Sequence, residues 1–437
     1  MKNVKEFSEK SQINLHSLST DGELEHLYDD VQILEEHVYN DEERLRAAVP
    51  ALLSWFSSHA RILPWRENPT PYRVWLSEIM LQQTRVEAVK PYFERFVGEL
   101  PDIAALAEAD EDKYLKLWEG LGYYSRVRNL SKAAKQVMEE YGGELPGEYE
   151  KLLKLPGIGS YTAGAISSIA FGQKVPAVDG NVLRVISRVL ESREDISEPS
   201  TKKWLEMLLG QVMSEDAPGQ FNQALMEVGA TVCIPRGEPL CEQCPFYTLC
   251  LSRRDGLTGE IPVKKKTKAR RVEERTVLLI CDGSRVAVRK RPGKGLQAGL
   301  YEFPNWSGWL GEDEIWAEVR AMLGSPEKQP GVPKEESSAR CPQKDDDSAK
   351  NDGRPEISPA GDAVHIFSHV EWRMKGYLVR VPKAWTAAVK SCGDGEAARE
   401  NETVMVDIEA LKTRYTIPSA FCAYTEKIAE LLNKHRN

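Results

Sequence analysis

The sequence predicts two structured domains, an all-α domain followed by an α+β domain. Three observations indicate this fold class. From Leu45 to about Leu251, apolar residues recur at the three- and four-residue spacing of amphipathic helices. The basic run Val263-Lys-Lys-Lys-Thr-Lys-Ala-Arg-Arg271 then precedes segments of β-type composition. The length of 437 residues allows two or three domains, and 41% hydrophobic residues can fill packed cores.

The chain begins with an acidic extension, residues 1–44. Residues 1–45 carry twelve acidic and four basic side chains, so they account for −8 of the formal net charge of −9. We expect this extension to be solvated. The remainder is nearly neutral and can still carry a local basic groove, so net charge does not exclude a nucleic-acid partner.

The sequence shows no membrane or export signal. No apolar run reaches the roughly 20 residues that span a bilayer, and the polar N-terminus lacks a signal-peptide core. We therefore expect an intracellular protein with no membrane partner.

The all-α domain is expected over residues 45–252, with Gly- or Pro-containing loops between short helices. Its clearest helical patterns are Leu45–His59, Trp75–Phe96, Leu130–Tyr141 and Thr162–Phe171.

A basic linker is expected over residues 253–271, and an α+β domain over 272–437. Residues 325–362, rich in Pro, Gly, Ser and charge, are predicted to form a disordered insertion. The β-type segments are Arg275–Cys281, Arg285–Lys290, His365–Ser368 and Tyr377–Val381, and the helical patterns are Glu312–Leu323 and Phe421–Asn433.

Two glycines stand in the string Leu155-Pro-Gly-Ile-Gly-Ser-Tyr-Thr-Ala-Gly164, directly before a predicted helix. Gly157 and Gly159 allow a sharp turn, and exposed N–H groups at the helix start can bind an anion such as a DNA phosphate. For the Gly-x-Gly fragment alone, an ordinary turn between packed helices is the favoured interpretation. The full string Leu155-Pro-Gly-Ile-Gly159, with a helix on each side, is similar to a helix-hairpin-helix motif, which is a far more specific signal.

Two carboxylates have both a structural and a chemical interpretation. Asp179, in Val178-Asp-Gly-Asn-Val-Leu-Arg-Val185, is suited to cap a helix, and a functional carboxylate can share that position. Glu78, in Trp75-Leu-Ser-Glu-Ile-Met-Leu-Gln-Gln-Thr84, lies in an apolar stretch, where desolvation would favour a proton donor. Taken alone, Glu78 is more simply an N-terminal helix glutamate.

Four of the eight cysteines fall within eighteen residues, in the pattern Cys233-x7-Cys241-x2-Cys244-x5-Cys250. Four thiolates at this density are typical of a [4Fe–4S] cluster or a structural zinc site. Spacing alone does not distinguish the two metals.

Together these strings resemble the adenine DNA glycosylases of the MutY type, within the helix-hairpin-helix superfamily. The resemblance is specific from about Leu45 to Ser252 and weaker over 272–435. It implies a helix-hairpin-helix glycosylase domain with an iron–sulfur loop, followed by a Nudix-like domain. It also favours a [4Fe–4S] cluster over zinc, although this chain has seven residues between Cys233 and Cys241 where the family usually has six.

The resemblance implies a role for each matching residue. Glu78 matches the acid that protonates N7 of adenine, and Asp179 matches the carboxylate that stabilises the oxocarbenium ion. Asn181 and Tyr161 match residues that position these groups. The remaining matches are Trp65, Arg66 and Gln223 in the adenine pocket, Gln83 and Tyr123 in the base stack, and Leu121 near the oxidised guanine.

In the C-terminal part, Leu296-Gln-Ala-Gly-Leu-Tyr-Glu-Phe-Pro304 and His365-Ile-Phe-Ser-His369 are similar to the family's recognition module. Phe367, Ser368 and His369 match a loop that checks for 8-oxoguanine. Tyr161 replaces the lysine of bifunctional lyases, so base removal without efficient strand cleavage is expected.

The resulting hypothesis is a monomeric base-excision enzyme that acts on A:8-oxoG or A:G pairs in duplex DNA. It would work in the cytoplasm or nucleoid of a bacterium, or in a nucleus. The alternatives are a glycosylase for thymine opposite guanine and a non-catalytic binder of damaged DNA. The Phe-Ser-His loop argues against the first, and the presence of both carboxylates argues against the second.

Overall fold

The computed structural model describes residues 39–265, 269–323, 356–387, 389 and 399–434. The chain divides into two compact units. One, here the cysteine unit, comprises residues up to Ile62 together with Gly147–Leu153 and Ile158–Lys265. The other, the sheet unit, comprises Leu63–Pro146, Lys154–Gly157 and Lys266–Asn437. Within the described part of the chain, none of the helices combines the length and the hydrophobicity of a membrane-spanning segment.

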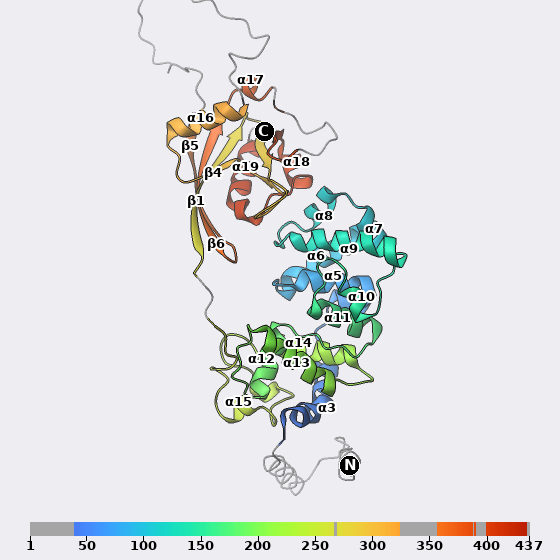
Figure 1. Ribbon diagram of the computed structural model, residues 1–437. Helices are drawn as coiled ribbons and strands as arrows, with labels where there is room; N and C mark the ends of the chain where they lie inside the picture. The colour runs from blue at the N-terminus through green and yellow to red at the C-terminus, as the bar shows by residue number, and fades with distance from the viewer. Residues whose placement is uncertain (1–38, 266–268, 324–355, 388, 390–398, 435–437) are drawn as a thin grey trace, which may run out of the picture. The chain divides into compact units, whose positions relative to one another are not determined.

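Among its described residues the cysteine unit is helical. The first helix, α3, begins at Asp41, inside the range expected for the acidic extension, because Asn40 and Glu43 form a reciprocal capping box. Residues 1–38 lie outside the described part. The helices are α3 (Asp41–His59), α10 (Tyr149–Leu152), α11 (Ser160–Phe171), α12 (Gly180–Val189), α13 (Pro199–Val212), α14 (Pro218–Thr231) and α15 (Leu251–Arg254), with the 3-10 helix η1 (Cys241–Gln243) (Figure 1).

Helix α14 organises this unit, because it packs against α3, α11 and α12. The core between these helices is apolar, with Leu52, Val182 and Leu225 each at most 1% exposed. Burial of each such side chain contributes about 1.5–3 kcal/mol. This packing places the start of α12, where Asp179 lies, against a rigid neighbour.

The helical part of the sheet unit differs from the sequence-based expectation at one point. The segment Trp75–Phe96 was expected to be helical throughout, but two helices cover it, with a break at residues 82–85. Gln83 has a φ of 58°, which a right-handed helix cannot accommodate. The helices are α4 (Pro64–Glu67), α5 (Pro71–Leu81), α6 (Val86–Glu99), α7 (Ile103–Glu108), α8 (Glu111–Leu117) and α9 (Ser125–Tyr141).

The C-terminal part of the sheet unit is a mixed sheet with helices. Its strands are ordered β3-β2-β1-β6-β5, with β4 paired to β1 and β7 paired to β2. Strands β1 and β6 are parallel, and the other pairs are antiparallel. The strands are β1 (Arg271–Cys281), β2 (Val286–Lys290), β3 (Tyr301–Glu302), β4 (Asn305–Ser307), β5 (Glu356–Ile366), β6 (Val370–Arg380) and β7 (Thr403–Val406). The helices are α16 (Glu312–Leu323), α17 (Lys383–Thr386), α18 (Ile408–Thr413), η3 (Ser419–Phe421) and α19 (Cys422–Lys434).

Helices cover both faces of this sheet (Figure 1). Alternate residues of β1 enter two cores: Val277 and Leu279 pack with residues of α19, while Leu278 and Ile280 pack with residues of α16. This two-residue alternation explains why the second half of β1, Val277–Cys281, is an unbroken apolar run rather than an alternating one. The predicted α+β domain is confirmed.

Several predicted boundaries move. Strand β5 begins at Glu356, inside the range 325–362 expected to be a disordered insertion, because its backbone pairs with β6 from Glu356 onward. Residues 324–355 lie outside the described part. The expected strand His365–Ser368 ends at Ile366, where Phe367 N–H donates to Val370 O at 2.8 Å and closes a tight turn. Strand β1 begins at Arg271, the last residue of the expected linker.

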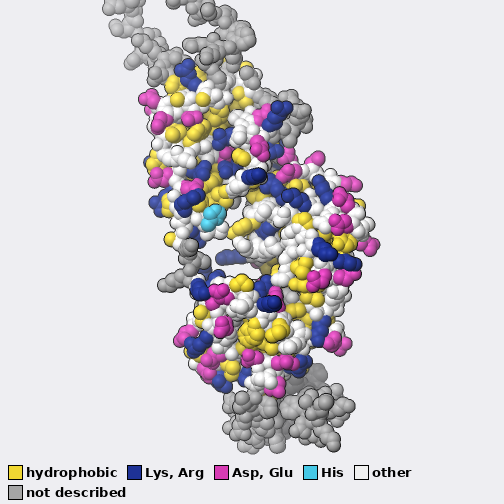
Figure 2. Space-filling view, in the orientation of Figure 1, with side chains coloured by type: hydrophobic (Ala, Val, Ile, Leu, Met, Phe, Trp, Pro, Cys, Tyr) yellow, Lys and Arg dark blue, Asp and Glu magenta, His cyan; other side chains and the backbone are white. Residues whose placement is uncertain are grey.

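The visible surface mixes both charge signs. In Figure 2, lysine and arginine side chains are interspersed with aspartate and glutamate over the described residues. This distribution agrees with a chain whose net charge resides almost entirely in its first 45 residues.

Candidate functional site

Asp179 caps helix α12. Its Oδ1 accepts hydrogen bonds from the N–H groups of Asn181 and Val182 at 2.9 and 2.8 Å. Its Oδ2 accepts from Asn181 Nδ2 at 2.8 Å. The predicted N-cap is therefore confirmed, and the positive end of the helix dipole also stabilises the carboxylate.

Burial at the helix start raises the pKa of Asp179 above its ordinary value of 3.8. The hydrogen bonds from Val182 and Asn181 and the charge of Arg184 act in the opposite direction but do not cancel it. Asp179 is therefore more basic than an exposed aspartate, while its geometry is fixed by its own helix.

Asn181 is held from both sides. Besides donating to Asp179, it accepts from Arg184 Nη2 at 3.0 Å. Arg184 also donates from Nε to Cys233 O at 2.8 Å and from Nη2 to Gly229 O at 2.7 Å. A Cβ on Gly229 would lie 2.6 Å from Asn181 Cβ, so only glycine allows α14 to approach this closely. Neither Arg184 nor Gly229 belongs to a local sequence pattern that predicts its contacts, so the roles of both residues become apparent in the folded structure alone.

Tyr161 and Gln223 lie in the same unit as Asp179. Tyr161, in α11, is half-buried, and its hydroxyl donates to Met226 Sδ at 3.5 Å. Gln223, in α14, donates from Nε2 to Gly219 O at 3.3 Å. Since α14 packs on both α11 and α12, one framework carries all three side chains.

The glycines of residues 155–164 occupy a sharp turn and a helix start. Gly157 has a φ of +80°, and a Cβ there would lie 2.8 Å from Asn129 Cβ. Gly159 is the N-cap of α11, and no atom lies within 4 Å of a Cβ built on it. Gly157 is required by conformation and packing, whereas a side chain at Gly159 would meet open space.

Glu78 is buried in α5, with 6% of its surface exposed. Its interpretation as an N-terminal helix glutamate is wrong, because α5 begins at Pro71 and ends at Leu81. The neighbouring Ser77 donates from Oγ to Val74 O at 2.9 Å. A carboxylate near the negative end of a helix does not favour that helix, so helix stability does not explain its presence.

Trp65 and Arg66 belong to the short helix α4. Trp65 is 6% exposed and packs edge-to-face on Phe93, with ring centroids 5.4 Å apart. Arg66 is half-buried at the end of that helix. The packing of Trp65 on Phe93 therefore fixes the short helix that carries Arg66.

Gln83 and Tyr123 each lie at a left-handed turn, with φ values of 58° and 47°. Both side chains are exposed, Tyr123 by 49%, whereas Leu121 beside it is 7% exposed. Gly120 packs under Tyr92, whose hydroxyl would lie 2.1 Å from a Cβ at that position. The backbone thus holds both side chains outward.

Phe367, Ser368 and His369 form the turn between β5 and β6. Phe367 packs on His365 and Trp372, with ring centroids 4.6 and 4.9 Å away. Ser368 and His369 are exposed, and their Oγ and Nδ1 atoms lie 3.2 Å apart. Four predicted site residues line one pocket of the sheet unit: Leu121, Tyr123, Phe367 and Ser368.

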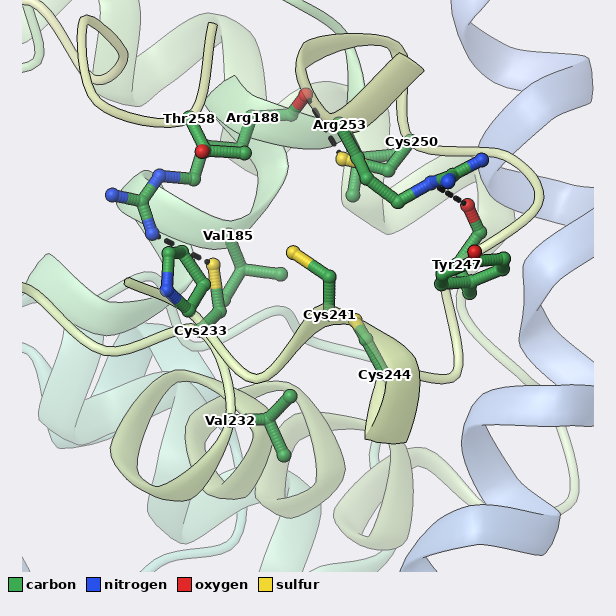
Figure 3. A pocket seen from close by; sticks show the side chains of 12 residues that line it. Val185, Arg188, Val232, Cys233, Cys241, Cys244, Tyr247, Cys250, Arg253 and Thr258 are labelled. Carbon is green, nitrogen blue, oxygen red and sulfur yellow. Dashed lines mark hydrogen bonds between the residues drawn. The ribbon is translucent and has the colours of Figure 1, made fainter. Parts of the chain in front are cut away.

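The four clustered cysteines line a single pocket of the cysteine unit. Their sulfur atoms lie around one space in Figure 3, and none of the four forms a disulfide. Arg188 Nη1 donates to Cys233 Sγ at 3.2 Å, and Cys250 Sγ donates to Arg188 O at 3.4 Å. Among the described residues, no three His, Cys, Asp or Glu side chains surround a single metal-ion position.

The chemistry of this pocket suits a metal centre. Burial is the main cause that raises the pKa of Cys244 to about 12 and that of Cys250 to about 11. Neighbouring cysteines raise both pKa values further, so a nearby positive charge would favour the thiolate form in this pocket. Four cysteines are the donor set of both [4Fe–4S] clusters and structural zinc sites, but a zinc ion needs its ligands around one position, which the described side chains do not provide.

Comparison with known proteins adds two family matches. Residues 76–211 match the HhH-GPD superfamily of base excision DNA repair proteins, and residues 276–427 match the NUDIX domain. The chain is 38% identical to the adenine DNA glycosylase of Mus musculus over 401 residues, which cover 80% of this chain and 73% of that protein. It is 34% identical to that of Homo sapiens over 396 residues, covering 78% and 68%.

The chain belongs to the adenine DNA glycosylase family. A third relative, from Buchnera aphidicola subsp. Schizaphis graminum, is 34% identical over 271 residues, which cover 60% of this chain and 78% of that protein. The solved structure of a thermostable thymine-DNA glycosylase is 28% identical, with a TM-score of 0.44, over 48% of this chain and 97% of that one.

This glycosylase is therefore a base-excision repair enzyme that acts on adenine, as the sequence predicted. Its helix-hairpin-helix part and its Nudix-like part are both confirmed.

Proposed function

We propose that this glycosylase hydrolyses the N-glycosidic bond of adenine paired with 8-oxoguanine, or with guanine, in duplex DNA. The observation that carries this proposal is the contrast between two carboxylates. Glu78 is buried in an apolar helix, and Asp179 is held by Asn181 and the N–H groups of α12. Two carboxyl groups in different environments are what glycoside cleavage requires.

The two groups would act on opposite ends of the breaking bond. Glu78 gives its proton to N7 of adenine, so the base leaves as a neutral molecule when the C1′–N9 bond breaks. Asp179 stabilises the oxocarbenium ion that remains on the sugar. Water then adds to C1′ and loses a proton, which restores the protonated form of Glu78. The products are adenine and an abasic site.

The remaining assignments describe how DNA is bound. Adenine must leave the base stack to be reached, and Gln83 and Tyr123 present exposed side chains that can fill the gap. Trp65, Arg66 and Gln223 would form the pocket for the extruded base. Gly157 and Gly159 would let a phosphate approach the start of α11.

Recognition of the partner base is assigned to the turn between β5 and β6. Ser368 and His369 are exposed, while Phe367 anchors the turn on Trp372. Leu121 would lie beside the oxidised guanine, in the pocket it shares with Phe367 and Ser368.

Tyr161 makes the reaction monofunctional, because a phenol cannot form a Schiff base with the sugar. We infer that the enzyme acts as a monomer where chromosomal DNA lies, in a nucleoid or a nucleus.

Cys233, Cys241, Cys244 and Cys250 would hold a [4Fe–4S] cluster, with zinc as the alternative. Such a cluster would supply the positive charge that keeps the thiolates ionised and would cross-link the segments that carry them. Analysis of iron, sulfide and zinc in the purified protein, together with its visible absorption spectrum, distinguishes the two.

Single-turnover excision on duplexes with one central A:8-oxoG, A:G, T:G or A:T pair tests the reaction. Hot alkali reveals abasic sites, and an untreated sample reports lyase activity. We expect alkali-dependent cleavage of the adenine strand, fastest opposite 8-oxoguanine. Cleavage at T:G would support the thymine-directed alternative, and binding without cleavage anywhere would support a non-catalytic role. Strong cleavage without alkali would contradict the assignment of Tyr161.

A further inference from the structure

The two exposed residues Gln83 and Tyr123 both have a left-handed backbone conformation. They are two of the five non-glycine residues with positive φ among the described residues. A left-handed backbone is unfavourable for a residue with a Cβ and persists only where its surroundings enforce it. Gln83 follows α5, and Tyr123 precedes α9, so the two turns are forty residues apart in sequence.

One nitrogen of Arg126, which lies in α9, binds the first turn. Arg126 Nη1 donates to the carbonyl oxygens of Ile79, Met80 and Gln82 at 2.8, 2.9 and 2.6 Å. These carbonyls belong to the end of α5, where backbone oxygens lack partners within the helix. The guanidinium therefore ends α5 just before Gln83.

The other terminal nitrogen reaches across to the second turn. Arg126 Nη2 donates to the carbonyl oxygens of Leu121 and Gly122 at 3.2 and 3.1 Å. It also reaches Thr84 Oγ1 at 3.3 Å. The residues that flank Gln83 and the two that precede Tyr123 therefore share one planar group.

Arg126 is also buried, with 9% of its surface exposed. Burial lowers its pKa to about 10, so it remains charged at neutral pH. Its guanidinium carbon lies 5.3 Å from the ring centroid of Trp118 and 5.7 Å from that of Tyr123. The group that binds both turns thus also contacts the Tyr123 ring directly.

We propose that Arg126 is a positioning residue that couples Gln83 and Tyr123, so that both side chains enter the base stack as one unit. This inference rests on the proposed function, which assigns the two side chains to the stack. A lysine at position 126 keeps the charge but concentrates its donors on one nitrogen, so it cannot serve both turns.

The test is a mutant cycle read by fluorescence and by excision. The duplex carries 2-aminopurine beside a 2′-fluoro-2′-deoxyadenosine placed opposite 8-oxoguanine; the fluorine disfavours the sugar cation, so binding is observed without cleavage. The variants are R126K, Q83A, Y123A, Q83A/Y123A and the triple variant. R95K is the matched control, because Arg95 is exposed and donates to the carbonyl oxygen of Leu117 alone, at 3.0 Å.

We expect R126K to reduce the fluorescence rise and to slow single-turnover excision of unmodified adenine by about 10- to 100-fold, as small misplacements do. When R126K is added to Q83A/Y123A, the excision rate should fall by less than about twofold further, because the effect of R126K is transmitted through those two side chains. R95K should change neither signal. Losses that multiply in every background would overturn the coupling.

A second cycle leaves Arg126 in place. If Gln83 and Tyr123 act as one unit, the Q83A/Y123A variant loses no more than about the larger single loss. Multiplied losses would contradict the inference even if R126K does not fold. Wild-type fluorescence and excision in both Q83A and Y123A would overturn the proposed stacking roles together with the coupling, whereas multiplied losses overturn the coupling alone.

Discussion

The surroundings of Asp179 and of Glu78 show two ways of placing a carboxylate. Asp179 is oriented by residues within three positions of it, through the cap of its own helix. Glu78 lies in a helix whose end is bound by Arg126, which is more than forty residues away in sequence. The first arrangement can be inferred from a short string of residues. The arrangement at Glu78 cannot be inferred in this way, because the sequence does not show which distant side chain binds the end of its helix.

The D179N variant tests the structural and the chemical role of Asp179 separately, and its expected effect on excision is among the largest. Asparagine caps helices as well as aspartate, so stability should change by less than about 1 kcal/mol. Loss of the charge should slow single-turnover excision by on the order of 10³-fold. Thermal unfolding and excision of the same preparation measure both quantities.

The control for D179N is D102N, because Asp102 caps α7 through Ala105 N–H at 2.8 Å and has no proposed catalytic role. It should retain full stability and activity. Excision by D179N at the wild-type rate would show that Asp179 caps its helix and has no catalytic role.

At Glu78, E78Q removes the proton donor while preserving size. We expect DNA binding to remain and excision to fall by about 10²- to 10⁴-fold, the usual contribution of general acid catalysis. Electrophoretic mobility shift and single-turnover excision separate the two effects. The matched variant E94Q alters an exposed glutamate of α6 and should behave as wild type. Unchanged excision by E78Q would refute the assignment.

The cap at Asp179 also depends on the close contact between Gly229 and Asn181, which donates to Asp179. The G229A variant disturbs this contact. The added Cβ would lie 2.6 Å from Asn181 Cβ, so either α14 or the start of α12 must shift. We expect about a tenfold slower excision and a packing cost of about 1–3 kcal/mol, partly offset by better helix propensity.

G210A provides the comparison, because the nearest atoms to its Cβ belong to the Pro176 side chain at 3.9 Å. There the alanine should stabilise α13 by up to about 1 kcal/mol without affecting excision. Equal behaviour of G229A and G210A would show that Asn181 does not need the close approach.

The pH dependence of excision tests the environment of Asp179 more finely. Its carboxylate must be ionised to stabilise a cation, and its pKa lies above 3.8, so the rate should fall on the acid side at a pH above that of an ordinary aspartate. N181A removes a hydrogen bond that lowers this pKa and should move the acid limb to higher pH. An acid limb that stays in place in N181A would show that another group controls it.

The smallest effect is expected for N40A, which removes the capping box of α3 far from the chemistry in sequence. Loss of this cap should cost about 1 kcal/mol of unfolding free energy and leave excision unchanged. Denaturant unfolding measures the first quantity. A reduced excision rate in this variant would mean that α3 contributes to the site.

Features that depend on interactions between neighbours in sequence could be predicted, and features that depend on distant contacts could not. The helical pattern, the change to strands after the basic run and the cap at Asp179 depend on neighbours in sequence, and all were predicted. The break at residues 82–85 was missed because the apolar spacing continues through it, while Gln83 is held left-handed by contacts from α9. The start of β5 was missed because composition suggested disorder, whereas pairing with β6 forms a strand.

Periodicity and short strings predicted the two domain types, the clustered cysteines and the capped carboxylate, and the resemblance of those strings to known sequences indicated the family. In the periodic helices and at the capped carboxylate, the interacting atoms are separated by only a few residues. Three features become visible in the folded chain alone: Arg126 binds two turns, Gly229 must lack a side chain, and Arg184 joins Asn181 to the Cys233 segment. An arginine side chain is long and flexible, so its guanidinium can reach many hydrogen-bond acceptors. The packing of the folded chain selects which of them it binds.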